Sequence, residues 1–594
     1  MFRYCLFVFI LFISVSCTQK ENESELAVFQ GRIKSDVKTW DPANAYDEIS
    51  SHLIANIYET LYQYQYLASS YRLEPLLAAA MPTYSADGKV LTIPIRRGVK
   101  FQDDPCFKRT QGKGRELTAQ DFVFALKRLA LPSLQSSGWW VLDGKVLGAN
   151  AFHDKLLKAP KAEVQKVFQE SVEGIQAIDA FTLQIRLVRK SPDFLYLLAM
   201  TLTSPVPWEA VERYADEKGN LSTHPVGTGP FTLTRWDRGH RVLLTRVPNF
   251  RKELYPFQSS KVFQERGMGA DFGKTLPFLD QILMTVIPED QPAWLNFMKG
   301  KLDMIVLPKD NFRQAIVNQV NLTPELVKKG VHLSIETGNI VRFIAFNMKD
   351  PVLGANKYLR QALSSAIDRE KWIELFTNNT AKKMVNAVPP GIDDRPATSK
   401  LKYDFHLARA RTLLERAGYP RGVGLPVLRF DLSGASTTAR QLVDFLIQQF
   451  APLGVKIEVI ENTFPAYLSK LKNGSLQIFY AGWSLDFPDA SNIYQLLYGP
   501  NQSPGTGESN YDNPVFDRLF EQIETMPSGP KRSALIQKME DLIQEDCPWA
   551  MGYYEATFVL SQPWFMNYRD SPIITNKYKY FRVNKEVKQR YLSQ

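Results

Sequence analysis

The spacing of apolar residues over residues 426–460 predicts a strand, a helix and a second strand. Residues 427–430 form a short apolar run, and residues 455–459 alternate between apolar and polar side chains, as strands do. Between them, apolar residues recur at helical spacing behind Ser436, a suitable N-cap: Leu442, Phe445, Leu446 and Phe450. Short links between such elements predict a βαβ unit, and therefore a partly parallel sheet.

Two further apolar stripes predict core helices over residues 405–417 and 358–375. In the N-terminal half, residues 86–89 (ADGK) predict a hairpin turn between alternating segments. Thr118 and Asp121 have the spacing of a capping box at the start of a helix. The chain is therefore predicted to mix helices and strands along its whole length.

The first residues have the pattern of an export signal. An apolar core over residues 6–13 precedes small residues and then Cys17. This core is too short to span a bilayer, so we expect a signal peptide over residues 1–16. A Cys directly after the small residues resembles a bacterial lipoprotein signal, which implies a lipidated Cys17 followed by a polar tether over residues 17–27. Ser14 stands where lipoprotein signals usually have leucine, so an ordinary cleaved signal is the alternative.

Length and composition limit the class of protein. A chain of 594 residues is too long for one core, and its 44% hydrophobic and 23% charged residues are ordinary for a globular protein. The net charge of +10 is not gathered into a long basic arm, and no nucleic-acid motif accompanies it, so no nucleic-acid partner is expected. Cys106 and Cys547 remain after the signal, and a disulfide between them is one alternative in an oxidising compartment.

One acidic residue lies in an unusual setting. A strand-like run over residues 476–481 leads to Trp483, then to Asp486 and the following Phe487. A carboxylate among aromatic side chains is costly when it is buried alone, so it needs a cationic partner from the protein or from a ligand. The alternative is a turn-capping Asp before Pro488.

Known enzyme motifs are missing from the sequence. The six histidines are scattered, and the chain has no HExxH, no GxSxG elbow and no Walker loop. The turn at Gly227 and Gly229 lacks a third glycine and precedes a strand, which argues against a phosphate cradle. No catalytic residues, cofactor or metal are therefore expected.

The chain resembles the family 5 extracellular solute-binding proteins, the oligopeptide- and dipeptide-binding lipoproteins of ABC importers. The resemblance covers roughly residues 30–570 and rests on the number and order of short motifs. These are TWDP at 39–42, LTIPIRRGVKF at 91–101, LTAQDFVFALKR at 117–128, PVGTGPF at 225–231, FN at 346–347, LRQALSSAIDR at 359–369, LLERAGY at 413–419, GW with Asp486 at 482–486, and EDCP to YY at 545–554. The chain departs from the family in a longer segment at 102–116 and another around 250–280.

This resemblance implies an α/β, two-lobed, clam-like fold of the type II periplasmic-binding-protein class. Lobe I would comprise residues 28–336 and 556–594, with an extra subdomain at about 55–200, and lobe II would comprise residues 337–555. A monomer that binds its ligand between the lobes is implied, exported and lipid-anchored in the periplasm or on the outer face of the cell membrane. It would deliver the ligand to an ABC permease and ATPase complex.

The resemblance also implies a set of ligand-binding residues. In peptide-binding relatives, an Asp three positions after the Gly-Trp dipeptide holds the ligand's α-ammonium, and here that residue is Asp486. Several relatives have an Arg for the peptide carboxylate where this chain has Tyr480, so we expect Arg342 to substitute. The remaining residues expected at the cleft are Trp483, Tyr554, Trp139, Trp140, Tyr46 and Glu48.

Three other functions stay open at this point. The first is the same fold binding a nickel chelate, haem, a sugar or an opine instead of a peptide. A tethered surface protein without a transport role is the alternative from another class. A hydrolase is the least supported of the three, since no motif indicates one.

Overall fold

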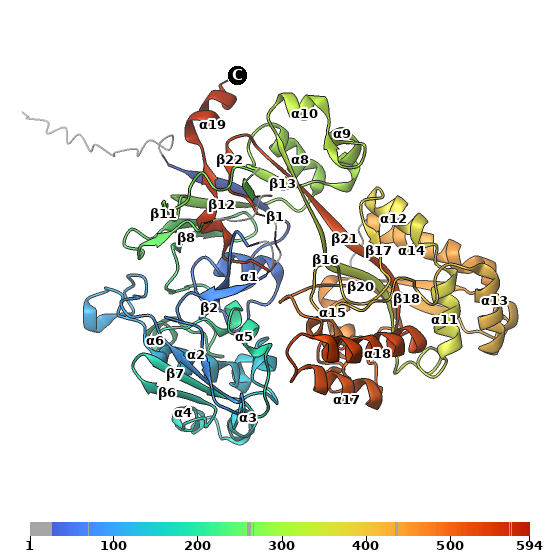
Figure 1. The fold of residues 1–594 in the computed structure, drawn as a ribbon, viewed down its shortest axis with the longest axis horizontal. Coiled ribbons are helices and arrows are strands. Elements are labelled where there is room, and N and C mark those ends of the chain that lie inside the picture. The colour runs from blue at the N-terminus through green and yellow to red at the C-terminus, as the bar shows by residue number, and fades with distance from the viewer. Residues whose placement is uncertain are drawn as a thin grey trace, which may run out of the picture.

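The protein is built from two lobes, which lie side by side in the computed structural model (Figure 1). The structure describes residues 26–68, 71–257, 263–264, 266–433, 437–569, 571 and 573–593. The expected signal peptide, Cys17 and Ser436 lie outside these ranges. No helix in the described part of the chain combines the length and apolar character that crossing a bilayer requires.

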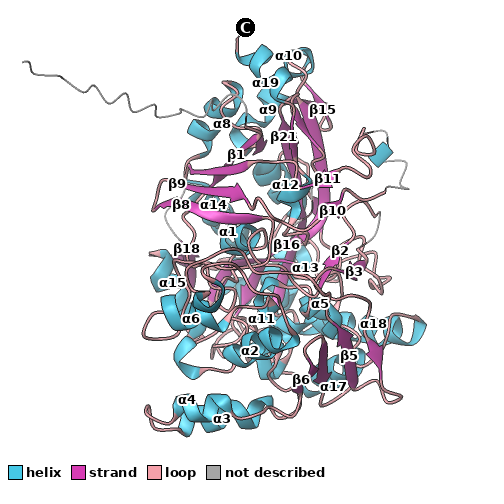
Figure 2. Ribbon diagram, turned by 90° about the vertical axis from the view of Figure 1, so that its left-hand side faces the viewer, coloured by secondary structure: helices cyan, strands magenta, loops and turns pink. Residues whose placement is uncertain are grey.

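Lobe I contains two four-stranded sheets. The first has the order β1-β12-β9-β8 and is formed by β1 (Val28–Ile33), β12 (Gln281–Val286), β9 (Arg241–Arg246) and β8 (Phe231–Asp237). The second has the order β4-β5-β7-β6 and is formed by β4 (Thr83–Tyr84), β5 (Val90–Pro94), β7 (Thr182–Arg186) and β6 (Ile175–Asp179). It lies within the segment expected to form the extra subdomain, at the opposite end of the lobe from the C-terminal helix α19 (Lys585–Leu592) (Figures 1 and 2).

Lobe II is organised on a seven-stranded sheet that reaches into lobe I. Its order is β13-β21-β16-β20-β18-β19, with β17 also pairing with β21. The strands are β13 (Met304–Val306), β21 (Trp549–Ser561), β16 (His332–Phe346), β20 (Ile478–Ser484), β18 (Leu428–Ser433), β19 (Ile457–Asn462) and β17 (Lys382–Lys383). The long antiparallel strands β16 and β21 run from one lobe to the other, and so they are the connections about which the lobes can move (Figure 1).

Short strand pairs and helices complete the two lobes. The short strands are β2 (Tyr62–Tyr64), β3 (Leu73–Pro75), β10 (Glu253–Leu254), β11 (Thr275–Leu276), β14 (Ile316–Val317), β15 (Asn321–Leu322), β22 (Phe565–Met566) and β23 (Arg582–Val583). Besides α19, the helices in the described part of lobe I are α1 (Glu48–Ile54), α2 (Ala119–Leu129), α3 (Ala149–Lys158), α4 (Val164–Gln169), α5 (Phe194–Leu197), α6 (Trp208–Tyr214), α8 (Asp290–Met298), α9 (Phe312–Ala315) and α10 (Pro324–Lys328). Those of lobe II are α11 (Lys357–Ala366), α12 (Arg369–Thr377), α13 (Leu407–Arg416), α14 (Thr437–Phe450), α15 (Phe464–Lys472), α16 (Ser491–Tyr494), α17 (Pro514–Ile523) and α18 (Pro530–Asp546).

Most of the elements predicted from the sequence are confirmed. β18 and β19 pair in parallel on either side of α14, as the βαβ prediction requires. β4 and β5 pair across the predicted hairpin, and the Asp121 side chain accepts a hydrogen bond from the Thr118 amide at 2.9 Å, which completes the capping box. The single helix expected over residues 358–375 is wrong. The chain forms α11 and α12 instead, because Asp368 caps the second helix by accepting from the Lys371 amide.

The two cysteines of the described chain are both buried and free. Cys106 packs in the core of lobe I, whereas Cys547 packs in the core of lobe II beneath α11. The disulfide alternative is therefore not realised in this structure.

Candidate ligand site between the lobes

A cavity of about 350 Å³ lies between the two lobes. Lobe I supplies α1, the segment 199–202 and Tyr64 of β2, and lobe II supplies the end of β20 with the turn that follows it. Asp486 lies just beyond β20, which runs parallel to β18, and so it occupies the carboxyl end of a parallel pair. Ligands of open α/β sheets bind at such ends.

The Asp486 carboxylate is held by two neutral donors. The Tyr46 hydroxyl donates to Oδ2 at 2.9 Å, and the Asn492 side-chain amide donates to the same oxygen at 3.1 Å. Among the described residues, nothing donates to Oδ1 and no cation pairs with the carboxylate. Burial raises the pKa of Asp486 to about 6, although the bonds from Asn492 and Tyr46 pull it down. The carboxylate therefore keeps one oxygen for a cationic donor.

Asn492 of α16 is the residue that fixes this corner of the cavity. Its Oδ1 accepts hydrogen bonds from the Trp483 indole and from the Asp486 amide, both at 3.0 Å. Because the residue is fully buried, its three hydrogen bonds lock Trp483 and Asp486 in one relative orientation. The sequence analysis did not find Asn492, since an asparagine six positions after an aspartate has no recognised pattern.

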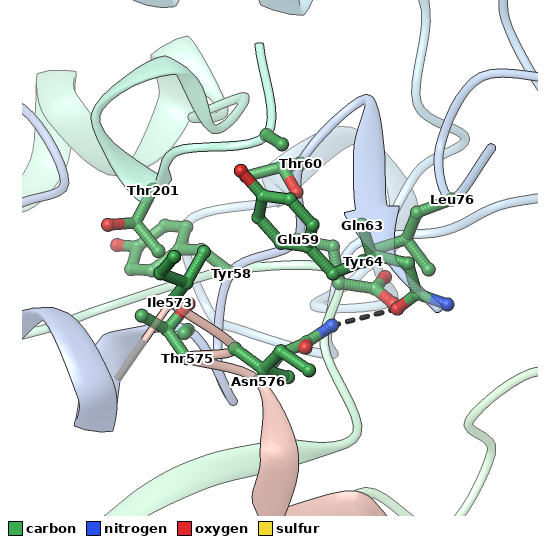
Figure 3. A pocket seen from close by; sticks show the side chains of 13 residues that line it. Tyr58, Glu59, Thr60, Gln63, Tyr64, Leu76, Thr201, Ile573, Thr575 and Asn576 are labelled. Carbon is green, nitrogen blue, oxygen red and sulfur yellow. Dashed lines mark hydrogen bonds between the residues drawn. The ribbon is translucent and has the colours of Figure 1, made fainter. Parts of the chain in front are cut away.

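A smaller cavity of about 20 Å³ shares part of its wall with the main one, and Figure 3 shows the side chains that line it. Tyr64, Thr201, Ile573 and Thr575 line both cavities. The Tyr64 side chain is 6% exposed and its hydroxyl has no partner within the described structure, so it is a second group able to bond a ligand. Sequence reasoning missed this tyrosine as well.

Four of the residues predicted for the site line the main cavity: Asp486, Trp483, Tyr46 and Glu48. Glu48 is exposed at the first turn of α1, at the rim of the cavity. Trp140 lies farther out, with its ring 6.1 Å from that of Tyr46, and lines a neighbouring cavity of about 410 Å³ between the lobes.

The other three predicted residues do not line the main cavity. Trp139 stacks on His153 at 4.5 Å within lobe I. Tyr554 is buried in lobe II, where its hydroxyl donates to the Asn386 carbonyl at 2.7 Å. A ligand-binding role for these two side chains would require them to leave these contacts.

Arg342 is committed to a contact within the protein. Its Nε lies 2.7 Å from a Glu555 carboxylate oxygen, and its side chain crosses Gly482 on the neighbouring strand. A Cβ added at Gly482 would lie 2.6 Å from Arg342 Nη1, so the glycine provides the space for this pair. The expected recognition of a ligand carboxylate by Arg342 therefore stays a prediction that its geometry does not favour.

Contacts between the lobes lie at the main cavity and at the neighbouring cavity of about 410 Å³. Besides the bond between Tyr46 and Asp486, the Ser491 hydroxyl of lobe II donates to Asp193 of lobe I at 2.9 Å. Tyr196 stacks on Phe487 at 5.7 Å, and Arg189 forms an ion pair with Glu524. These contacts join the two lobes directly, so the lobes are closed on each other in this structure.

The sequence profile described as bacterial extracellular solute-binding proteins, family 5, middle region, matches residues 72–505. The chain belongs to this family. Its fold agrees with DppA of Helicobacter pylori, an ABC transporter-associated periplasmic binding protein solved with the peptide STSA. The TM-score is 0.72 at 22% identity, over 94% of this chain and 98% of that one.

Curated relatives of this family 5 protein are also binding proteins. Heme-binding protein A of Haemophilus influenzae is 24% identical over 508 residues, which cover 84% of this chain and 82% of the relative. Glutathione-binding protein GsiB of Escherichia coli O157:H7 is 24% identical over 525 residues, which cover 87% of each chain. The predicted family and the two-lobed fold are thus confirmed, while relatives at this distance differ in the ligand they are named for.

Proposed function

We propose that this protein is the substrate-binding lipoprotein of an ABC importer and that it captures peptides between its lobes by their free amino group. The observation that carries the proposal is Asp486, a carboxylate in the inter-lobe cavity with one oxygen unused by the described residues. A peptide α-ammonium can neutralise the carboxylate and donate a hydrogen bond to its unused oxygen. The closed lobes lower the local dielectric around this ion pair and so strengthen it. The role is binding rather than catalysis.

The lining of the cavity favours a peptide over the ligands of the named relatives. Its described residues include two acids, Glu48 and Asp486, and neither Lys nor Arg. Haem carries two carboxylates and no amine, and glutathione carries two carboxylates for its one amine, one carboxylate more than a simple peptide; each extra carboxylate would lie in this acidic cavity without a cationic partner. A ligand recognised chiefly by its amine fits better.

The position of the protein in the cell completes the proposal. We infer that residues 1–16 direct export and that a lipid on Cys17 anchors a monomer through the tether at 17–27. The lobes, with boundaries near residues 337 and 555, would then meet the permease and ATPase at the membrane surface. Mass spectrometry of the mature protein tests the anchor, because a diacylated Cys17 at the N-terminus is expected.

The ligand class is tested by thermal shift of residues 18–594 with free-amine peptides, haem, glutathione and nickel. A peptide present at a hundredfold excess over its dissociation constant stabilises the protein by about 2.7 kcal/mol. We expect peptides to raise the melting temperature and the other three solutes to leave it unchanged. A shift with haem or glutathione alone would assign the protein to the alternative solute class.

Peptide affinity is expected to fall as the pH drops below about 6, the pKa of Asp486 in the ligand-free protein. A bound ammonium stabilises the ionised carboxylate, so the complex carries fewer protons than the free protein and affinity rises with pH. The expected slope is up to about tenfold per pH unit below pH 6, with a plateau above it. Titration calorimetry across this range measures it.

His52 in the same cavity is the control for this pH dependence. A protonated imidazole would repel an ammonium, so it would change affinity in the same direction. Asp486→Asn should flatten the profile, whereas His52→Asn should leave the step near pH 6 in place. A profile that survives Asp486→Asn would assign the titration to another group.

A further inference from the structure

A second, smaller cavity lies behind Trp483 in lobe II. Its volume is about 10 Å³, and its walls include Phe343, Phe479, Ala481 and Trp549. A space of this size holds one group as large as a water molecule. Trp483 lines both this cavity and the main one, so the two cavities meet at this residue.

Glu508 and Ser509 line this small cavity, together with the neighbouring Thr506. In the described structure no donor and no cation contacts the Glu508 carboxylate. The Ser509 side chain is 2% exposed, and its hydroxyl has no hydrogen-bond partner there either. A buried hydroxyl without a partner is costly, so an unpaired hydroxyl next to an unpaired carboxylate in an apolar setting indicates that this site receives a polar group.

The chemistry of the cavity selects the group. A carboxylate and a hydroxyl oxygen accept hydrogen bonds from a cation, and desolvation raises the pKa of Glu508 to about 7, as expected for a carboxyl group without a counter-ion. Aromatic walls suit an aliphatic stem that carries a cation, because cations are attracted to indole and phenyl faces. An ammonium matches the available space, whereas the planar guanidinium of arginine is larger.

We propose that the cavity behind Trp483 is a second cation subsite, which receives the ammonium group of a lysine side chain of the bound peptide on Glu508 and Ser509. The proposal rests on peptide binding in the main cavity. The α-ammonium would pair with Asp486 on one side of Trp483, and the lysine side chain would pass this indole to reach Glu508 on the other. The preferred ligand is then a lysine-containing peptide.

Calorimetry with three pairs of tripeptides tests this proposal. Each pair carries lysine or norleucine at the first, second or third position among alanines, so that the members differ by the ammonium group. Lysine is expected to bind at least tenfold more tightly than norleucine at one position, and arginine at that position to bind more weakly than lysine. Glu508→Gln should bring the lysine and norleucine affinities to within about twofold, with norleucine binding unchanged.

Each outcome has a distinct meaning. Equal affinities within all three pairs would overturn the subsite, leave peptide binding intact, and assign the cavity to a water molecule. A lysine preference that survives Glu508→Gln would place the cation elsewhere, for instance at Glu48. Absence of binding by every peptide would overturn the proposed function and the subsite together.

Ser509→Ala provides an independent variant in case Glu508→Gln disturbs folding. It keeps the charge of the loop and removes one acceptor, so it should lower the lysine-to-norleucine ratio about threefold and leave norleucine binding as it is. An unchanged ratio in Ser509→Ala, together with loss of all binding in Glu508→Gln, would contradict the proposal.

Discussion

Replacing Asp486 by asparagine is expected to weaken the binding of free-amine peptides at neutral pH by at least about 100-fold. The variant removes the charge, whereas its side chain still accepts hydrogen bonds from Tyr46 and Asn492. A ligand ammonium left buried without its counter-ion costs about 3–5 kcal/mol, and each 1.4 kcal/mol is a factor of ten in affinity. Titration calorimetry with the tightest peptide of the thermal-shift panel measures the loss.

The same substitution is expected to stabilise the ligand-free protein. The folded-state pKa of Asp486 lies above its ordinary value, so the ionised carboxylate destabilises the fold above about pH 6 and protonation relieves this below it. Asp486→Asn should therefore raise the melting temperature of the ligand-free protein at neutral pH while it weakens peptide binding. Glu461→Gln, at an exposed pair with Arg440 away from the cavity, changes the net charge equally and should alter neither property. A destabilised Asp486→Asn would mean that the carboxylate is structural.

Replacing Arg532 by methionine is expected to lower the free energy of unfolding by about 3–5 kcal/mol. The guanidinium is 1% exposed and contacts Asp394 at 2.9 Å and Asp489 at 2.6 Å. It also lies 3.6 Å from Asp193 of lobe I. Methionine occupies a comparable volume but leaves these buried carboxylates without a cation. Urea denaturation followed by circular dichroism measures the difference.

Arg440→Met is the matched control for this stability prediction. Arg440 also forms a bidentate ion pair, with Glu461, but both side chains are about half exposed, at 55% and 46%. Such surface pairs contribute between about 0 and 1 kcal/mol. Equal effects of the two methionine variants would show that the Arg532 cluster does not stabilise the fold.

The family motifs could be recognised in the sequence, but the structure shows that several of them maintain the fold and not the site. Asp41 of the first motif is fully buried, and its carboxylate accepts two hydrogen bonds from the Arg128 guanidinium of the third motif, at 2.6 and 3.1 Å. Gly227 and Gly229 lie against the backbone of Ile57, where an added Cβ would come within 2.0 and 2.6 Å of carbonyl oxygens. Motif order therefore predicted the architecture better than it predicted the ligand contacts.

The site was only partly predictable because contacts between distant segments decide it. The strand and Trp before Asp486 indicated a costly carboxylate, and the structure gives it two donors but no cation among the described residues. The 440 positions between Tyr46 and its partner Asp486 explain why local pattern could not define this bond. For Tyr554 the motif predicted a contact with the ligand, but in the structure its hydroxyl donates a hydrogen bond to the Asn386 carbonyl within lobe II.

The central claim is that Asp486 pairs with the amino group of the ligand, and a four-way titration tests it most directly. The wild type and Asp486→Asn are each titrated at neutral pH with one peptide and with its N-acetylated form. We predict a coupling of about 2 kcal/mol or more between the substitution and the acetylation, because either change removes the same ion pair. Equal losses of affinity for both peptides in Asp486→Asn, with no coupling, would contradict the claim.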